Sequence, residues 1–199
     1  MNVIVHPGID ERTTTAAEGL PRRRWTTAEL IRLTDLGVFR DENKLELIGG
    51  EIVPMSPAGR RHEVVREDLE FLLRRLAGDE LRVVAEPQLN LTDDTYTEPD
   101  ILVRPATVRT PDVRGPTALL VIEIAASSLD YDLGTKARIY AQHGVREYWV
   151  VEAATLATTV HRDPGPGGYE TTVELAASDL LTPHLAPALA VRLADLDLD

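Results

Sequence analysis

One short run, residues 118–125, constrains the fold more than any other part of the chain. It reads ALLVIEIA and is apolar at every position except Glu123. A strand that is apolar on both faces is typical of the middle of a covered sheet, so this run predicts a central strand. An ionised carboxylate is costly there unless it is paired or bound to a metal. The alternative is that Glu123 lies at a strand end, in water or beside an arginine.

A second acid, Asp100, opens the apolar run ILV directly after Pro99. Adjacent strands of a sheet lie about 4.8 Å apart. Asp100 and Glu123, if they lie on neighbouring strands, could therefore share one divalent cation through the oxygen ligands that Mg²⁺ prefers. The alternative, a solvated strand end, applies to Asp100 as well.

The segment after Glu123 predicts a crossover helix. DLGTKARIYAQHG is typical of a helix that stops at Gly144, and REYWVVE then indicates another central strand. Such a unit places its helix against the sheet. Asp132 and Lys136 share one helix face, which Tyr140 continues. Lys136 can thus reach the end of the Glu123 strand; the alternative is a surface Asp132–Lys136 ion pair, which contributes only about 0.3–0.5 kcal/mol.

The remaining segments complete an α/β or α+β arrangement with a mixed sheet. Thr26 and Glu29 form a capping box that begins a short helix ending at Gly37. Gly49-Gly50 predicts the turn of a hairpin between KLELI and EIVPM, and residues 62–76 predict an amphipathic helix. Further strands are expected at LRVVAEPQLNL, YTEPDILV, LATTVHR, YETTVEL and LAVRLADL.

Composition excludes several classes of function. The 199 residues include no cysteine, which excludes disulfide scaffolds, thiolate metal sites and cysteine nucleophiles. No run approaches the roughly 18 apolar residues of a membrane span, and the N-terminus lacks a signal-peptide pattern. We therefore expect a cytoplasmic protein without membrane contact. No HExxH, P-loop, GxGxxG or GxSxG motif supports nucleotide, hydride or serine chemistry.

Charge is unevenly distributed along the chain. The net charge of -12 argues against a generic nucleic-acid binder. Residues 1–76, however, hold 12 basic and 13 acidic groups, against 9 and 20 in residues 77–199. Arginines cluster at positions 22–24, 60–61 and 74–75, so a polyanion is expected to meet this part. Residues 1–20 predict a flexible tail, and residues 21–199 a single domain.

Two other residues have alternative interpretations. Glu46 alternates with Leu45 and Leu47 in the first hairpin, a position that usually faces solvent. His62 follows two arginines at a helix start, where a lone histidine is usually structural or solvated.

Taken in order, these motifs resemble the Uma-two family of endonucleases in the PD-(D/E)XK, or restriction-endonuclease-like, superfamily. The resemblance rests on YTEPDILV, on LLVIEIAASSLDYDLGTKARIYAQHGVREYWVVE and on the opening block KLELIGGEIVPMSPAGRRH, over about residues 25–161. It implies an α/β fold with a mixed central β-sheet flanked by helices. It also implies a Mg²⁺- or Mn²⁺-dependent endonuclease whose substrate is nucleic acid, DNA in the first place, and which can act as a homodimer.

The resemblance also implies roles for the acids and the lysine. Asp100 matches the PD aspartate and Glu123 the second acid, so both would hold the metal, with the backbone carbonyl of Ala125 as a further ligand. Ala125 stands where the superfamily has its lysine, and Lys136 on the following helix takes that place to assist water attack. Glu46 resembles an extra N-terminal acid that binds a second metal or polarises Lys136.

Three residues have supporting roles in the same comparison. His62 matches a frequent family histidine, Tyr140 lies one turn beyond Lys136, and Asp132 begins the same helix face.

Two alternatives to a nuclease stay open. A binding or assembly protein could keep the fold without turnover, because the net charge is -12 and family acids are replaced by Gly49 and Ala126. A hydrolase of smaller phosphate esters would also suit an acidic surface.

Overall fold

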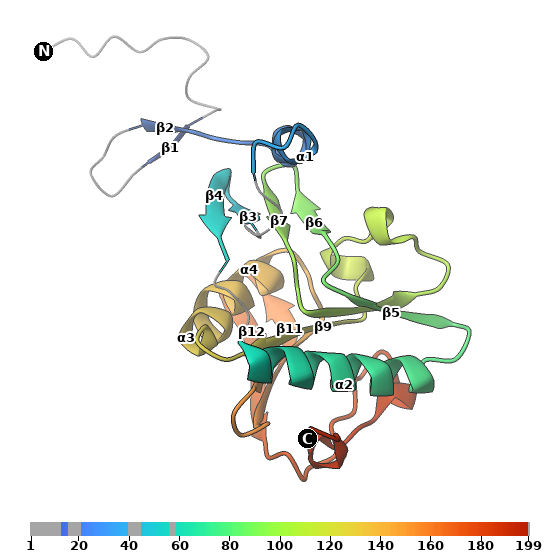
Figure 1. Ribbon diagram of the computed structural model, residues 1–199. Helices are drawn as coiled ribbons and strands as arrows, with labels where there is room; N and C mark the ends of the chain where they lie inside the picture. The colour runs from blue at the N-terminus through green and yellow to red at the C-terminus, as the bar shows by residue number, and fades with distance from the viewer. Residues whose placement is uncertain (1–12, 16–20, 40–44, 56–58, 199) are drawn as a thin grey trace, which may run out of the picture. The chain divides into compact units, whose positions relative to one another are not determined.

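The computed structural model describes residues 13–15, 21–39, 45–55 and 59–198 (Figure 1). The chain forms two compact units: a small unit, Met1–Met55 with Asn90–Thr97, and a large unit, Ser56–Leu89 with Glu98–Asp199. Of the predicted tail 1–20, all but Thr13–Thr15 lies outside the described residues. Within the described part of the chain, no helix combines the length and the apolar character that crossing a bilayer requires.

The large unit is built on a six-stranded mixed sheet. Its strands, in sheet order, are β12 (Gly168–Leu175), β11 (Thr158–Gly165), β10 (Glu147–Glu152), β9 (Leu120–Ala125), β8 (Ile101–Pro105) and β5 (Leu81–Ala85). Strands β9 and β10 are parallel, and every other neighbouring pair is antiparallel. The predicted crossover and the predicted central strand are therefore both confirmed.

Helices complete the large unit. They are α2 (Arg60–Leu76), α3 (Leu129–Tyr131), the π-helical turn η4 (Asp132–Lys136) and α4 (Ala137–Gln142). Short 3-10 turns are η2 (Thr110–Asp112), η3 (Gly115–Thr117), η5 (Pro187–Leu189) and η6 (Leu193–Asp195).

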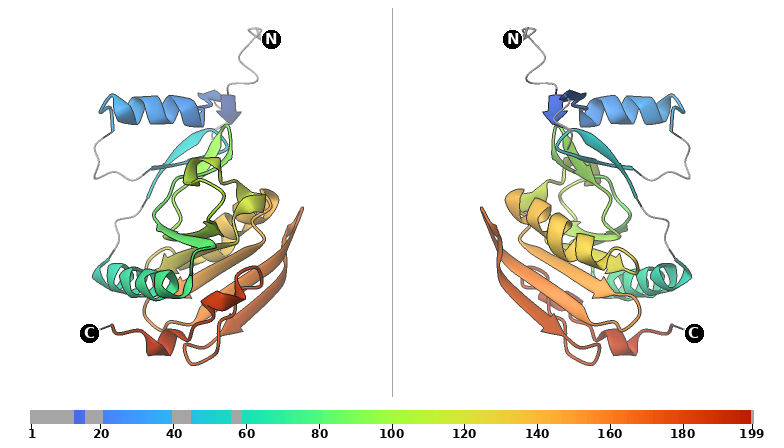
Figure 2. Two further views of the ribbon diagram at one scale, coloured as in Figure 1. Left: turned by 90° about the vertical axis from the view of Figure 1, so that its right-hand side faces the viewer. Right: turned by 90° about the vertical axis from the view of Figure 1, so that its left-hand side faces the viewer.

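Alternation of side chains along β9 assigns the two faces of this sheet. One face packs against α2 in the main core. Figure 2 shows α2 to one side of the strands. From α2 and β9 this core takes Val65, Leu69, Leu73, Leu120, Ile122 and Ile124. Glu123 alternates with them and projects to the opposite face, where the α3–α4 segment lies.

The small unit contains α1 (Thr27–Asp35) and a four-stranded sheet. Its strands, in sheet order, are β4 (Glu51–Pro54), β3 (Leu45–Ile48), β7 (Thr95–Thr97) and β6 (Leu89–Thr92), and β1 (Thr13–Thr15) pairs separately with β2 (Pro21–Arg23). The predicted capping box is confirmed: Glu29 N–H donates to Thr26 Oγ1 at 3.2 Å, and Thr26 N–H donates to Glu29 Oε2 at 3.1 Å. The β3–β4 hairpin turns through Gly49 and Gly50, whose φ angles of 58° and 84° favour glycine.

Three expectations about element boundaries are wrong. LRVVAEPQLNL and YTEPDILV each divide into two strands, β5 with β6 and β7 with β8, that belong to different sheets. The breaks fall at Pro87 and Pro99, which have no N–H for a strand ladder. LAVRLADL forms an isolated bridge between Val191 and Leu181, followed by η6, instead of a short strand.

An aromatic stack on the α4 face of the sheet encloses His161. The ring centroids of His161 and Tyr148 are 5.6 Å apart, and those of His161 and Tyr169 are 5.4 Å apart. His161 is 6% exposed; its Nδ1 bonds Thr172 Oγ1 at 3.1 Å, and its Nε2 has no hydrogen-bond partner among the described residues. Burial lowers the pKa of His161, because the charged imidazolium would lose its hydration.

This lowered pKa predicts that His161 makes the fold sensitive to acid. Below the ordinary histidine pKa of about 6.5, the unfolded chain binds a proton that the folded chain resists, so the free energy of unfolding falls as the pH falls. Urea unfolding of the wild type and His161→Gln on both sides of that pH checks this. The loss of stability in acid should be smaller in the variant; an equal loss in both proteins would contradict the assignment.

Candidate active site

The antiparallel register of β8 and β9 brings the two predicted acids opposite each other. Ile101 pairs with Ile122, and continuing the register by one residue pairs Asp100 with Glu123. Residues directly opposite in antiparallel strands project to the same face, with Cβ atoms about 4.5–5.5 Å apart. Asp100 is 8% exposed and Glu123 is 4% exposed. The alternative of solvated strand ends is therefore wrong for both acids.

Both carboxylate oxygens of Asp100 have partners within the large unit. The Ile124 N–H donates to Oδ2 at 2.7 Å, and His62 Nε2 lies 3.0 Å from Oδ1. Burial on its own would lower the pKa of His62, but the hydrogen bond and charge of Asp100, together with the charge of Glu63, raise it above its ordinary value. Asp100 thus favours a positively charged imidazole beside it.

Glu123 accepts two hydrogen bonds from the crossover helix. Lys136 Nζ donates to Oε1 at 2.9 Å, and the Tyr140 hydroxyl donates to the same oxygen at 2.8 Å. The side chains of Lys136 and Glu123 are each 5% exposed. The prediction that Lys136 reaches the Glu123 strand is confirmed, and the alternative of a surface pair with Asp132 is wrong because Lys136 and Asp132 are both buried.

The helix widens into a π-helical turn, Asp132–Lys136, just where it presents Lys136. Asp132 Oδ2 accepts a hydrogen bond from Ser128 Oγ at 2.5 Å, and the Tyr148 hydroxyl donates to the Asp132 carbonyl at 3.2 Å. Burial, together with the charges of Glu123 and Asp132, raises the pKa of Tyr148 well above its usual range, so Tyr148 remains a donor. Asp132 therefore anchors the start of the turn that ends at Lys136.

The backbone carbonyl groups of Ile124 and Ala125 point to opposite sides of β9. The Ala125 carbonyl accepts a hydrogen bond from the Ala153 N–H at 2.8 Å and so faces β10. Consecutive strand residues present their backbone groups to opposite sides, and the Ile124 N–H faces Asp100. The carbonyl directed toward Asp100 is therefore that of Ile124, where the sequence resemblance pointed to Ala125.

Glu46 belongs to β3 of the small unit. It is 1% exposed, so the usual interpretation of its alternation, a solvent-facing side chain, is wrong. Its part in the site stays a prediction, because the other candidate residues are in the large unit.

A divalent cation fits the chemistry of the two acids. Among the described residues, no three His, Asp or Glu side chains gather as a ready-made metal site. Mg²⁺ is nevertheless commonly held by one or two carboxylates, with water and substrate phosphate completing its shell. Asp100 and Glu123 supply that minimal oxygen donor set on one face of the sheet.

Another buried acid, Glu147, has a structural role. It accepts hydrogen bonds from Trp149 Nε1 at 2.8 Å, from Arg162 Nε and Nη2 at 3.1 and 2.9 Å, and from the His184 N–H at 2.7 Å. Three of these donors reach Oε1 and one reaches Oε2, and together they attach the C-terminal segment to β10.

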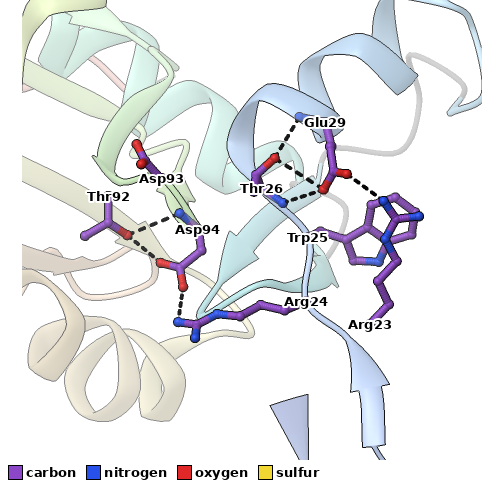
Figure 3. A pocket seen from close by; sticks show the side chains of 8 residues that line it. All are labelled: Arg23, Arg24, Trp25, Thr26, Glu29, Thr92, Asp93 and Asp94. Atoms are coloured by element: carbon purple, nitrogen blue, oxygen red, sulfur yellow. Dashed lines mark hydrogen bonds and ion pairs between the residues drawn. The ribbon is translucent and has the colours of Figure 1, made fainter. Parts of the chain in front are cut away.

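The small unit contains a pocket of about 560 Å³ (Figure 3). It is lined by Arg23, Arg24, Trp25, Thr26, Glu29, Thr92, Asp93 and Asp94. Arg23 pairs with Glu29 at 2.5 Å and lies 4.1 Å from the centroid of the Trp25 ring, and Arg24 pairs with Asp94. These two arginines of the predicted polyanion cluster are thus neutralised by acids of the same pocket.

Known proteins support the fold described above. The solved structure of "a putative nuclease belonging to DUF820" from Anabaena variabilis ATCC 29413 is similar, with a TM-score of 0.68, 18% sequence identity, and coverage of 85% of this chain and 96% of that chain. At this identity the likeness shows the fold alone, and the expected restriction-endonuclease-like α/β fold is confirmed. None of the curated proteins compared matches this chain.

A family model described as "Putative restriction endonuclease" matches residues 27–195. The matched range contains Asp100 and Glu123, and also Lys136, which pairs with Glu123. The chain therefore belongs to the Uma2 family, the family that its sequence motifs resemble.

Proposed function

We propose that this protein is a divalent-metal-dependent endonuclease that hydrolyses the phosphodiester bonds of nucleic acid, with DNA as the first substrate to test. Membership of the Uma2 family supports nuclease activity. The observation that most supports the proposal is the placement of Asp100 opposite Glu123, with Lys136 bonded to Glu123. Action as a homodimer and location in the cytoplasm stay predictions.

In this proposal Asp100 and Glu123 hold a Mg²⁺ or Mn²⁺ ion. Such an ion, when bound, offsets negative charge on the phosphoryl oxygens and lowers the pKa of its bound water. The Ile124 carbonyl replaces that of Ala125 as the backbone oxygen directed toward Asp100. His62 and Lys136 each provide a basic group to one acid, so the protein itself offsets the cost of burying both carboxylates.

Lys136 contributes a fixed positive charge beside the reacting phosphate. Its bond to Glu123 Oε1 and the Tyr140 hydrogen bond to the same oxygen hold the ammonium in one place. From there it can orient the attacking water and stabilise negative charge that develops in the transition state. Tyr140 and Asp132 are positioning residues, because they act on Glu123 and on the turn that presents Lys136.

A second candidate is a protein that keeps this fold but binds without turnover. The net charge of -12 favours it, because duplex DNA repels an acidic surface. Hydrolysis of a smaller phosphate ester is compatible with the same charge. Cleavage assays with DNA, RNA and small phosphodiesters separate these possibilities.

One prediction of this proposal concerns Glu123, the acid in the central strand. Glu123→Gln preserves the shape of the side chain but removes its charge, and should reduce Mn²⁺- or Mg²⁺-dependent cleavage by at least about a hundredfold. Rates are measured on duplex DNA with purified proteins, and Asp100→Asn should show a comparable loss. Glu174→Gln, which changes an exposed acid on β12, is the matched control and should cleave at the wild-type rate. Wild-type cleavage by Glu123→Gln would refute the assigned site.

A further prediction concerns the contribution of Lys136 to stability. Lys136→Met leaves Glu123 buried without its cation, and should lower the free energy of unfolding by about 3–5 kcal/mol. The double variant with Glu123→Gln should lose less free energy of unfolding than the two single variants lose together, because both single changes remove the same interaction. Urea unfolding of the four proteins measures this coupling. Additive losses would show that the ion pair is not energetically significant.

A further inference from the structure

Arginines from the three sequence clusters differ in how they are neutralised. Arg23 and Arg24 have acidic partners in the small unit, and Arg74 on α2 pairs with Glu70 at 2.5 Å. Arg60 and Arg61, in the first turn of the same helix, are exposed and form no ion pair with any residue that the structure describes. Arg75, near the other end of α2, is also exposed without an acidic partner among the described residues, and lies over the Phe71 ring. Arg60 and Arg61 therefore provide positive charge at the start of α2 that is available to a polyanion.

Arg61 is attached to the end of the inner strands near which the two acids lie. Its Nε donates to the Ala153 carbonyl at 3.1 Å, directly after β10. The adjacent residue, His62, bonds Asp100 in front of β8. Because β9 lies between β8 and β10, these two consecutive residues of α2 bracket the end of the strand that holds Glu123.

The remaining donors of Arg61 suit a phosphate group. With Nε bonded to Ala153, the two terminal amino groups have no partner in the described part of the chain. A guanidinium presents its N–H groups as a planar fork that matches two phosphate oxygens. The Ala153 bond fixes the direction of this fork before a ligand arrives, which reduces the entropy lost on binding. Arg61 is in the first turn of α2, so the positive end of the helix dipole lies beside it, and the N-cap Gly59 forms no side-chain capping bond there.

We propose that Arg61 binds a backbone phosphate of the nucleic acid next to the phosphate at Asp100 and Glu123. Arg61 bonds Ala153 after β10, and Asp100 directly precedes β8, two strand spacings or about 10 Å away. In this proposal Arg61 therefore contacts a neighbouring phosphate, while the acids face the phosphate that is cleaved. The assignment rests on the proposed function for the identity of the ligand. It adds a residue that determines where the backbone lies, and that binds phosphate whatever the base sequence.

The test is the binding of a short labelled DNA duplex in EDTA, where cleavage does not interfere. Arg61→Gln should weaken binding by about tenfold and reduce the slope of log K against log salt by about one, as expected for one lost phosphate contact. Arg61→Lys should retain the salt slope but lose part of the affinity, because an ammonium cannot form the paired contact. Thermal unfolding of each variant monitors the Ala153 tether, since a purely structural role would change stability and leave the salt slope intact.

The matched control is Arg75→Gln. It removes the same charge from an exposed position of α2 about 21 Å further along the helix, where Arg75 lies over the Phe71 ring. Binding and salt slope should stay near the wild-type values. If Arg75→Gln and Arg61→Gln weaken binding equally, net charge accounts for the effect and the Arg61 assignment is wrong.

Cleavage measured in parallel separates the two proposals. If the wild type cleaves and Arg61→Gln binds with unchanged affinity and slope, the phosphate contact is refuted while the nuclease proposal stands. If binding depends on Arg61 but no cleavage occurs with any metal or nucleic acid, the contact is supported and the nuclease proposal fails. If the wild type binds neither DNA nor RNA, both are refuted.

Discussion

The large unit depends on the burial of one carboxylate in the middle of its sheet. Glu123 lies in the central strand, and the cost of removing an ionised carboxylate from water is several kcal/mol. That cost is offset only if the crossover helix places Lys136 and Tyr140 over this strand. The parallel pairing of β9 and β10 and the π-helical turn that ends at Lys136 are the means by which the chain does so.

Asp100 makes the same requirement more severe, because it faces Glu123 on the adjacent strand. Two like charges at this separation repel each other, and the protein answers with one basic group for each, His62 from α2 and Lys136 from the crossover. Glu147 shows the contrast: it accepts four hydrogen bonds, from Trp149, Arg162 and the His184 amide, which fix a chain segment. A pair of acids on adjacent inner strands, each with its own basic partner, is suited to binding and chemistry more than to stability.

Much of this arrangement could be predicted from residue patterns. An acid inside an apolar strand, and a second acid opening another, identify Glu123 and Asp100 because burial makes such acids costly. The helix between two apolar strands predicts the crossover, and hence the reach of Lys136. What the pattern does not contain is the backbone: the Ile124 amide that binds Asp100 and the direction of the Ala125 carbonyl follow from register. The π-helical turn is also not predicted, because it depends on the contacts of Asp132 and Lys136 in the folded chain, which the residue pattern does not contain.

Other differences have equally local causes. Apolar runs through Pro87 and Pro99 suggest continuous strands, but a residue without an N–H breaks the ladder and lets each half join another sheet. His62 resembles an ordinary helix-start histidine, since its contact with Asp100 involves residues far apart in sequence. The difference between individual arginines depends on which acids reach them in the folded chain, as Glu29 reaches Arg23, Asp94 reaches Arg24 and Glu70 reaches Arg74.

The central claim is that Asp100 and Glu123 form one binding site for a divalent cation. Calorimetric titration of Mn²⁺ into the wild type, Asp100→Asn and Glu123→Gln tests it without any choice of nucleic-acid substrate. The account predicts saturable binding to the wild type that is lost in both variants, with each variant still folded. Binding that persists in either variant, or a wild type that binds no Mn²⁺ at millimolar concentration, would contradict it.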